Sequence, residues 1–152
     1  MHVILCEPEI PPNTGNVIRL CANAGATLHL VQPLGFDLDE RSVRRAGLDY
    51  HELAQVRVHA SFEACHAALG AARIFAIETH GARLYTEVQY RADDALLFGS
   101  ETRGLRREVL ERIGSQNVLR IPMLRGNRSL NLSNAAALVL FEAWRQLGFP
   151  GA

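Results

Sequence analysis

The sequence predicts an α/β protein with an open, mainly parallel sheet and helices on both faces of that sheet. The first observation is a series of six short apolar runs, each of four to six residues. Most of these runs are apolar at every position, which is typical of parallel strands that helices cover on both sides. The second observation is that helical patterns with capping residues and terminal glycines lie between the runs. Such alternation favours right-handed βαβ units.

The first half of the chain alternates between strand and helix. In order, its predicted elements are a strand at Val3–Cys6, a helix at Thr14–Ala24, a strand at Leu28–Gln32, a short helix at Arg41–Ala46 and a strand at Val56–His59. Asn13 or Thr14 can cap the first helix, because either side-chain oxygen can accept a free N–H group of the first turn. Gly25 and Gly47 are the expected stops, since glycine readily adopts the left-handed conformation in which many helices end.

The second half of the chain continues the pattern. Its predicted elements are a helix at Phe62–Leu69, strands at Arg73–Ile77 and Ala95–Phe98, a helix at Leu105–Ile113, a strand at Val118–Ile121 and a last helix at Asn134–Leu147. Ser61 and Ser133 precede two of these helices as candidate caps. Gly70, Gly114 and Gly148 follow the three helices as candidate stops.

The last helix, Asn134–Leu147, predicts a subunit interface. Its residues are apolar on almost every side until Arg145, and a helix that is apolar all round is buried. We expect a single domain over residues 1–152, which has little interior to enclose such a helix. A homodimer formed through this helix is therefore expected, two-fold pairs being the commonest closed assembly.

Lysine is absent, and all 16 basic residues are arginine. This composition excludes a Schiff-base lysine, a lysine that anchors pyridoxal phosphate and the lysine of a P-loop. Genomic base composition can account for an all-arginine chain. Arginine also suits the planar, bidentate capture of phosphate, and both explanations can hold together.

Cysteine usage and hydropathy favour a cytoplasmic protein. The three cysteines are widely spaced and form no CxxC pair, so we expect no disulfide framework. The longest apolar run, Ala135–Phe141, is far too short to cross a bilayer. Residues 1–8 lack the basic region of a signal peptide, and we expect neither export nor membrane contact.

The formal net charge of zero hides a segregation of charge. Residues 1–100 hold 8 arginines and 12 acidic residues, whereas residues 101–152 hold 8 arginines and 4 acidic residues. Seven of the arginines lie between Arg103 and Arg128. This asymmetry indicates an anionic partner for the second part of the chain, although arginines scattered over a solvated helix would give the same count.

Three polar loops follow predicted strands, at the sheet edge where ligands of open α/β folds bind. The first, Pro11–Asn16, leads to Arg19, which we expect on the first turns of the helix, beside an N-terminus that attracts anions. Taken alone, this segment is explained more simply as an ordinary capped helix start with a surface arginine, because such caps are common. The second loop, Leu97–Leu105, holds Glu101 and an arginine between two glycines that let a ligand approach the backbone.

The third loop, Ile121–Asn134, contains three asparagines, two serines and two arginines. Turn chemistry alone can account for them, but their density beside an apolar helix favours a site for a polar ligand. Other chemistries are excluded by their missing motifs. Leu105 stands where a P-loop needs lysine, and GxGxxG, HExxH and GxSxG are absent. The histidines and cysteines show no metal-ligand spacing, so no metal is expected.

Together the three loops resemble the sequence motifs of the SPOUT superfamily of methyltransferases, in its SpoU branch. Residues 13–19 resemble the first motif, residues 97–105 the second, and residues 121–134 the third. The motifs occur in this order, and the resemblance runs from end to end. It implies a deep trefoil knot in the C-terminal part of the sheet, which no periodicity predicts because knots are nearly absent from proteins.

The resemblance also implies a cofactor, S-adenosylmethionine, with S-adenosylhomocysteine as product. The positions that match cofactor-binding residues of the family are Ile77, Thr79, Gly99, Ile121, Ser129 and Leu130. Arg19 matches the catalytic arginine, and Asn13, Glu101 and Asn131 match residues that assist it. A guanidinium holds its protons in proteins, so we expect Arg19 to clamp a phosphate and stabilise a developing alkoxide rather than act as a base. Substrate phosphate or Glu101 would relay the proton.

Three further stretches show a narrower resemblance within this branch. Glu7–Asn16, Arg44–His51 and Phe141–Arg145 are similar to members that methylate the ribose 2′-hydroxyl of the tRNA wobble nucleotide, cytidine or uridine. The implied partners are a tRNA anticodon stem-loop and a second copy of the chain. The candidate RNA-binding residues are Arg103, Arg106, Arg107, Arg125 and Arg128. Two alternatives stay open: an rRNA ribose 2′-O-methyltransferase of the same branch and a non-catalytic RNA-binding factor.

Overall fold

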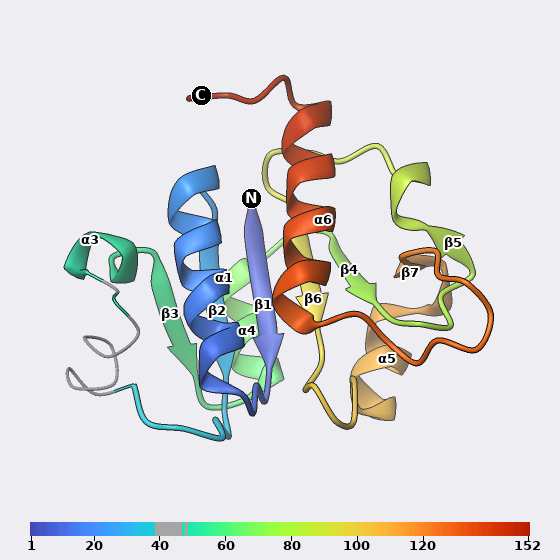
Figure 1. The fold of residues 1–152 in the computed structure, drawn as a ribbon, viewed down its shortest axis with the longest axis horizontal. Coiled ribbons are helices and arrows are strands. Elements are labelled where there is room, and N and C mark those ends of the chain that lie inside the picture. The colour runs from blue at the N-terminus through green and yellow to red at the C-terminus, as the bar shows by residue number, and fades with distance from the viewer. Residues whose placement is uncertain (39–46, 48) are drawn as a thin grey trace.

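An open, wholly parallel sheet of seven strands forms the centre of the computed structural model, which describes residues 1–38, 47 and 49–152 (Figure 1). The order across the sheet is β3-β2-β1-β6-β4-β7-β5. The strands are β1 His2–Cys6, β2 Thr27–Val31, β3 Val56–His59, β4 Ile74–Ile77, β5 Arg83–Leu84, β6 Ala95–Phe98 and β7 Val118–Arg120. The predicted fold class is confirmed.

Helices cover both faces of the sheet, as the double-sided apolar runs predicted. The helix α1 (Pro11–Ala24) and the C-terminal helix α6 (Leu132–Gln146) pack together on the face turned to the viewer in Figure 1. Behind the sheet lie α4 (Phe62–Leu69) and α5 (Arg107–Ile113). Three short elements complete the described part of the chain: α3 Tyr50–Leu53 and the 3₁₀ turns η1 Tyr85–Glu87 and η2 Ser115–Asn117. The short helix predicted at Arg41–Ala46 lies outside the described residues.

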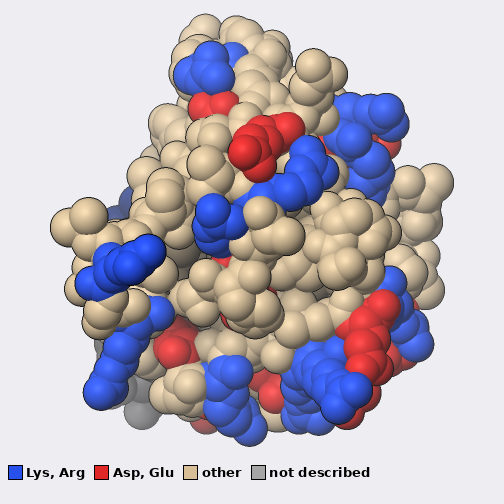
Figure 2. All heavy atoms as spheres, turned by 90° about the vertical axis from the view of Figure 1, so that its right-hand side faces the viewer, with Lys and Arg blue, Asp and Glu red and all other residues tan. Residues whose placement is uncertain are grey.

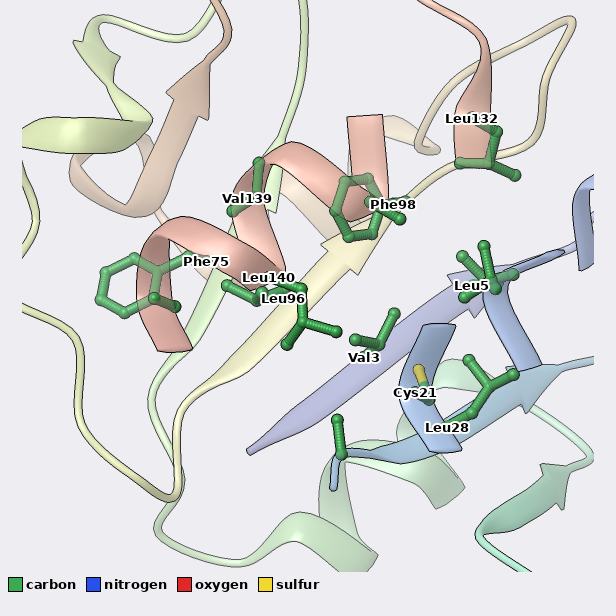
Figure 3. Packing of buried hydrophobic residues seen from close by; sticks show 14 of the residues in the cluster. Val3, Leu5, Cys21, Leu28, Phe75, Leu96, Phe98, Leu132, Val139 and Leu140 are labelled. Carbon is green, nitrogen blue, oxygen red and sulfur yellow. The ribbon is translucent and has the colours of Figure 1, made fainter. Parts of the chain in front are cut away.

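Alternate residues of each strand form two separate cores. Val3 and Leu5 point to α1 and α6, whereas Ile4 and Cys6 point to α4 and α5. Figure 3 shows the first of these cores, in which side chains of β1, β2, β4 and β6 meet Val139 and other residues of α6. This double burial explains why the strands read as continuous apolar runs rather than as alternating ones.

Three helix starts differ from the predictions. The helix α1 begins at Pro11 rather than Thr14, because two prolines take its first positions, where no N–H group is needed. Its N-cap is Ile10, so Asn13 and Thr14 are not caps. The helix α5 begins at Arg107 rather than Leu105. The helix α6 begins at Leu132, capped by Asn131 rather than Ser133.

Other predicted helix ends are confirmed. The Ser61 hydroxyl accepts the Ala64 N–H at 3.2 Å, which caps α4. Gly25 ends α1 with a left-handed φ of 65°. Gly70 and Gly114 follow α4 and α5 directly.

Within the single chain the helix α6 is buried on one side only, in line with the expectation that one domain has too little interior to enclose it. Ala136, Val139 and Leu140 are buried against the sheet, whereas Leu138 and Phe141 are 44% and 43% exposed. The outer side of α6 therefore presents apolar side chains to solvent in the single chain. Within the described part of the chain, no helix has the length and hydropathy needed to span a membrane.

The last strand, β7, lies between β4 and β5, which precede it in the chain. The connection from β4 to β5 therefore passes across β7. Gly81 allows this crossing, because a Cβ atom there would overlap the backbone of Leu119 and Arg120. The Arg120 guanidinium also donates to the carbonyl oxygens of Gly81 and Ala82, both at 2.9 Å. This is the part of the fold in which the knot is predicted.

Candidate active site

A cavity of about 500 Å³ lies at the carboxyl ends of β4, β6 and β7. Its walls come from Ile77 at the end of β4, Gly99 after β6, Ile121 after β7 and the first turn of α6. This is the sheet edge at which the three polar loops were predicted to meet. The size lies within the range of small-molecule sites in proteins, roughly 300–1,000 Å³.

Eleven of the fifteen predicted site residues line this cavity. All six predicted cofactor positions are among them, as are three of the four predicted catalytic residues and two arginines. They are Ile77, Thr79, Gly99, Ile121, Ser129, Leu130, Asn13, Glu101, Asn131, Arg103 and Arg128. The structure thus brings together segments that lie more than a hundred residues apart in the chain, and what each residue binds stays a prediction.

Arg19 lies away from the cavity, on the third turn of α1. The early start of the helix at Pro11 moves Arg19 away from the helix N-terminus, which corrects its expected place on the first turns of the helix. Its side chain turns to α3 instead: Nε donates to Glu52 Oε1 at 2.9 Å and Nη2 donates to the Gly47 carbonyl at 2.6 Å. The hydrogen bond from Arg19 lowers the pKa of the Glu52 carboxyl, with a further contribution from the Asp49 N–H.

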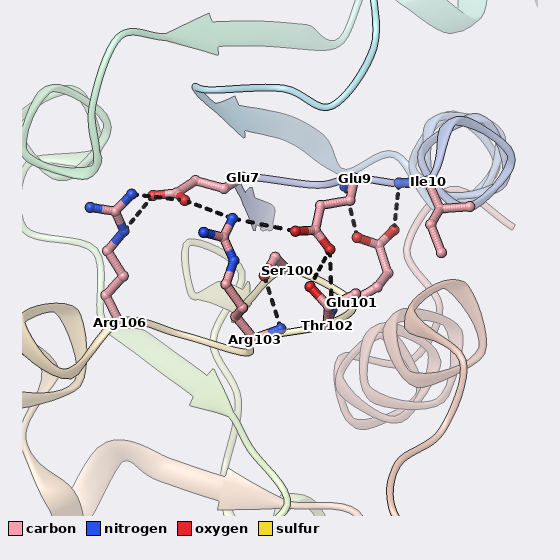
Figure 4. Close-up of polar contacts among 8 residues, drawn as sticks. All are labelled: Glu7, Glu9, Ile10, Ser100, Glu101, Thr102, Arg103 and Arg106. Atoms are coloured by element: carbon pink, nitrogen blue, oxygen red, sulfur yellow. Dashed lines mark hydrogen bonds and ion pairs between the residues drawn. The ribbon is translucent and has the colours of Figure 1, made fainter.

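Glu101 joins the second loop to the first. Its Oε2 accepts the Glu9 N–H at 2.8 Å, and its Oε1 accepts the Ile10 N–H at 3.2 Å (Figure 4). The same Oε1 also accepts an N–H of Asn13 Nδ2 at 3.0 Å. The N–H groups of Glu9 and Ile10 precede α1, whose N-cap has no capping side chain of its own. Both carboxylate oxygens thus accept hydrogen bonds from protein groups, so Glu101 holds the two loops together, and its part in proton transfer stays a prediction.

Asn131 joins the third loop to the other two. Its Oδ1 caps α6 by accepting the N–H groups of Ser133 at 2.9 Å and Asn134 at 3.3 Å. Its Nδ2 donates to Asn13 Oδ1 at 2.9 Å, and Asn13 in turn donates to Glu101. One hydrogen-bonded chain of Asn131, Asn13 and Glu101 therefore connects all three loops along one wall of the cavity.

Glu9, just before α1, makes a reciprocal contact with the second loop, and no pattern in the sequence had indicated this residue. Its Oε2 accepts the Thr102 hydroxyl at 2.7 Å and the Thr102 N–H at 3.2 Å, while Oε1 lies 3.3 Å from Arg103 Nη2 (Figure 4). These hydrogen bonds, led by that of the Thr102 hydroxyl, lower the pKa of Glu9. Each loop thus supplies a carboxylate that binds backbone N–H of the other.

Glu78 is a second missed residue of the cavity wall. It follows β4, its carboxylate accepts the Leu105 N–H at 2.8 Å, and its own N–H donates to the Leu119 carbonyl at 2.9 Å. Gly99 closes the loop from the other side, where a Cβ atom would overlap the backbone of Gly104 and Leu105. An acid directly after a buried parallel strand was the signal available in the sequence for Glu78.

The candidate RNA-binding arginines differ in their partners. Arg106 forms an ion pair with Glu7, Nε to Oε1 at 2.8 Å, and Arg103 lies near both Glu7 and Glu9. Arg107 pairs with Glu111 on the same helix. Arg125 and Arg128 are exposed on the third loop. Figure 2 shows that the face of the molecule with β5, α5 and β7 carries several groups of basic side chains, some of them next to acidic ones.

The comparison with known proteins agrees with this geometry. The sequence model of the SpoU rRNA Methylase family matches residues 1–141. A tRNA (cytidine(34)-2′-O)-methyltransferase from Burkholderia ambifaria is 58% identical over 152 residues, covering 99% of this chain and 97% of that protein.

Two solved structures extend the comparison. The first is a protein structure described as providing structural insights into the 2-OH methylation of C/U34 on tRNA. It is 47% identical, has a TM-score of 0.89, and the match covers 97% of this chain and 95% of that one. The other is the SpoU methyltransferase AviRb from Streptomyces viridochromogenes in complex with the cofactor AdoMet. It is 28% identical with a TM-score of 0.77, over 97% of this chain and 57% of that one. With its sequence matched almost from end to end and its fold shared, the chain belongs to the SpoU rRNA methylase family.

Proposed function

We propose that this protein is an S-adenosylmethionine-dependent methyltransferase that methylates the ribose 2′-hydroxyl of tRNA nucleotide 34, the wobble position. The observation that carries the proposal is the convergence of the three loops on one cavity, tied by Asn131, Asn13 and Glu101. The relatives support the substrate, because a 58% identical protein is named for this reaction on cytidine 34.

The residues of the cavity fit the proposed cofactor. Apolar side chains such as Ile77, Ile121 and Leu130 can pack against an adenine ring, and the carboxylate of Glu78 and the hydroxyl of Thr79 can meet polar groups. The missing Cβ atom of Gly99 leaves room for the backbone of Gly104 and Leu105, which keeps the second loop tightly closed at the cavity wall. When bound, S-adenosylmethionine supplies an electrophilic methyl group, and AviRb was solved with this cofactor.

The protein's own contribution is to align the ribose hydroxyl with the methyl group. Alignment of two reactants can lower a barrier by roughly 7–11 kcal/mol, and it requires rigid walls. The hydrogen-bonded chain from Asn131 to Glu101 provides one such wall, with the N-cap of α6 at one end and the start of α1 at the other. We propose that a knotted C-terminal region provides the second rigid wall, because the β4–β5 connection crosses β7.

Arg19 cannot act at the cavity of its own subunit from its place beside Glu52. A catalytic role for Arg19 therefore requires the RNA or a second subunit to bring the reacting ribose to it. The exposed apolar residues Leu138 and Phe141 of α6 support a homodimer, because a second copy could cover them. Since α6 packs beside α1, which carries Arg19, such a dimer would bring a second subunit close to Arg19. We propose that two copies of the chain associate through this face of α6. We also propose that the enzyme is a single domain and works in the cytoplasm.

The arginines of the second and third loops are the proposed tRNA contacts. Arg103 and Arg106 face Glu7 and Glu9, but exposed ion pairs contribute only about 0–1 kcal/mol, so an RNA phosphate can replace the carboxylate at little cost. Binding through several arginines releases counterions from the RNA. Affinity is expected to fall steeply with salt concentration.

The test is transfer of a labelled methyl group to bulk tRNA and to rRNA, followed by mapping of the modified nucleotide. A 2′-O-methyl group on nucleotide 34 of tRNA is the expected product. Methylation of rRNA alone would favour the other substrate of the branch, and no methylation of either RNA would favour a non-catalytic binding factor.

A second measurement concerns Arg19. Single-turnover methylation by Arg19→Lys and Arg19→Ala separates loss of charge from loss of bidentate geometry. Near-normal rates in both variants would remove Arg19 from the mechanism while leaving the substrate assignment intact.

A further inference from the structure

Two histidines and one cysteine converge on the face of the sheet that α4 covers. His29 belongs to β2, His59 ends β3, and Cys65 lies on α4. The ring nitrogens His29 Nδ1 and His59 Nε2 are 2.9 Å apart, and these two atoms and Cys65 Sγ all lie within 4.8 Å of one another. His29 and Cys65 are 5% and 0% exposed, and His59 is half-buried.

The topology, rather than a local motif, brings these residues together. In the parallel register of β2 and β3, His59 lies opposite Val31, and His29 is two residues earlier on the same face. The chain then turns after β3 and returns over this face as α4, which places Cys65 above the two rings. Ligands separated by thirty residues leave no spacing pattern, which is why the sequence predicts no metal site.

A third histidine holds the orientation of His29. His2 on β1 places its Nδ1 3.1 Å from His29 Nε2. When His29 Nε2 donates its hydrogen to His2, His29 Nδ1 presents its lone pair to the cluster. Metal-binding histidines are commonly oriented by such a second hydrogen bond.

We propose that His29 Nδ1, His59 Nε2 and Cys65 Sγ form a binding site for a zinc-like divalent cation. Nitrogen and sulfur are the donors that such borderline-soft ions prefer, and a water molecule from the half-exposed side of His59 can complete a tetrahedron. On binding, the Cys65 thiol gives up its proton to solvent, and the proton of His59 moves from Nε2 to Nδ1, so that only one proton is released.

The geometry requires small adjustments that side-chain rotation can provide. Zinc–nitrogen and zinc–sulfur bonds of about 2.0–2.1 Å and 2.3 Å place tetrahedral ligand atoms about 3.3–3.6 Å apart. The two ring nitrogens must therefore separate by a few tenths of an ångström, and Cys65 Sγ must come closer to them. None of the three residues lines the cavity at the carboxyl ends of β4, β6 and β7. The site would therefore fasten α4 to β2 and β3 rather than take part in methyl transfer.

The test is titration of the full-length protein, without a polyhistidine tag and treated with chelator, with Co²⁺ under reducing conditions. We expect one equivalent of Co²⁺ to produce the charge-transfer absorption of a cobalt–thiolate bond, and Zn²⁺ to displace it. Cys65→Ser is expected to abolish this absorption. Cys21→Ser is the matched control, because Cys21 is equally buried but lies on α1, on the other side of the sheet.

The histidines are tested by affinity. His59→Gln is expected to weaken Co²⁺ binding at least tenfold, whereas the exposed control His80→Gln is expected to leave it unchanged. Because His59 is half-exposed, this variant decides the question even if Cys65→Ser fails to fold. No thiolate absorption in the wild-type protein, or absorption that persists in Cys65→Ser or disappears in Cys21→Ser, would overturn the site. So would equal affinities of the His59→Gln and His80→Gln variants.

Discussion

Glu101 and Glu9 reach across from two different loops, and each binds backbone of the other loop. Glu101 accepts the Glu9 N–H, while Glu9 accepts the Thr102 N–H. Hydrogen bonds to ionised groups are about twice as strong as neutral ones, so this exchange fixes the spacing of the two loops. We propose that the two carboxylates affect the reaction indirectly, by fixing the position of the loops beside the cavity.

Replacement of Glu101 by glutamine tests this positioning role. The amide keeps one acceptor oxygen but turns an NH₂ group toward either Glu9 N–H or the donors of Ile10 and Asn13. We expect the single-turnover rate of Glu101→Gln to fall about 10–100-fold, or roughly 1.4–2.7 kcal/mol. The exposed Glu63→Gln is the control, and an unchanged rate in Glu101→Gln would contradict the role.

Thr14 offers a stability test at the same scale. Its side chain is 1% exposed, and among the described residues its hydroxyl oxygen has no hydrogen-bond partner. Valine has the same shape without the polar atom, so we expect Thr14→Val to raise the free energy of unfolding by about 1 kcal/mol. Chemical denaturation measures the change, and the exposed Thr86→Val is the control. A loss of stability would show that the hydroxyl has a partner in solution.

Most of the candidate site could be predicted because parallel strands end at the same edge of a sheet. The loops with Asn13, Glu101 and Asn131 each follow a strand, and the topology brought them to one cavity. The position of Arg19 could not be predicted, because the direction of its side chain depends on the exact start of α1 and on Glu52 of α3, thirty-three residues later. Glu9 was missed because nothing local shows that its partner is Thr102, ninety-three residues later.

At the scale of elements, α6 divides into a buried and an exposed side. Leu140 is 1% exposed and packs in the core with Val139, whereas Leu124 on the third loop is 82% exposed. We expect Leu140→Ala to lower the free energy of unfolding by about 2–5 kcal/mol, through lost burial and a cavity. Leu124→Ala is the matched control, with an expected change within about 0.5 kcal/mol. A similar decrease in the free energy of unfolding in both variants would contradict the burial of Leu140 in the core.

The strands were predicted more reliably than the helix starts, for a physical reason. Burial on both faces leaves a strong apolar signal in β1, β2, β4 and β6, whereas the edge strand β3 is mostly exposed and β5 has only two residues, which pair with β7 among the described strands. A helix start depends on which group satisfies its first N–H groups. The first two residues of α1 are prolines, which have no N–H group, and Glu101 from another loop accepts the N–H groups of Glu9 and Ile10 just before them, so the local candidates Asn13 and Thr14 gave the wrong start.

At the scale of the whole molecule, the exposed side of α6 predicts the oligomeric state. Phe141 is 43% exposed on this helix, and a charge there would be buried without a partner in the proposed dimer. We expect Phe141→Glu to sediment as a monomer and the wild type as a dimer, in sedimentation-velocity runs at the same concentration. Leu124→Glu, which changes an exposed loop residue, is expected to stay dimeric. A monomeric wild type would contradict the interface.

The net charge of zero is no obstacle to an RNA partner, because the charges are distributed unevenly. Two arginines of residues 101–152, Arg103 and Arg106, form ion pairs with Glu7 and Glu9, which precede α1. In the free protein, these ion pairs offset part of the positive charge of the arginines locally. The sequence predicted the basic region but could not show these pairs, which form between residues about a hundred positions apart.

The place of β7 between β4 and β5 also has a consequence for biosynthesis. Until residues 118–120 leave the ribosome, β4 has one unpaired side and β5 has no partner in the sheet. Unpaired strand edges invite pairing with other chains, and contacts between distant residues form slowly. The nascent chain is therefore most exposed to aggregation just before its final segment emerges, and premature termination near residue 117 would release a product with an open slot in its sheet.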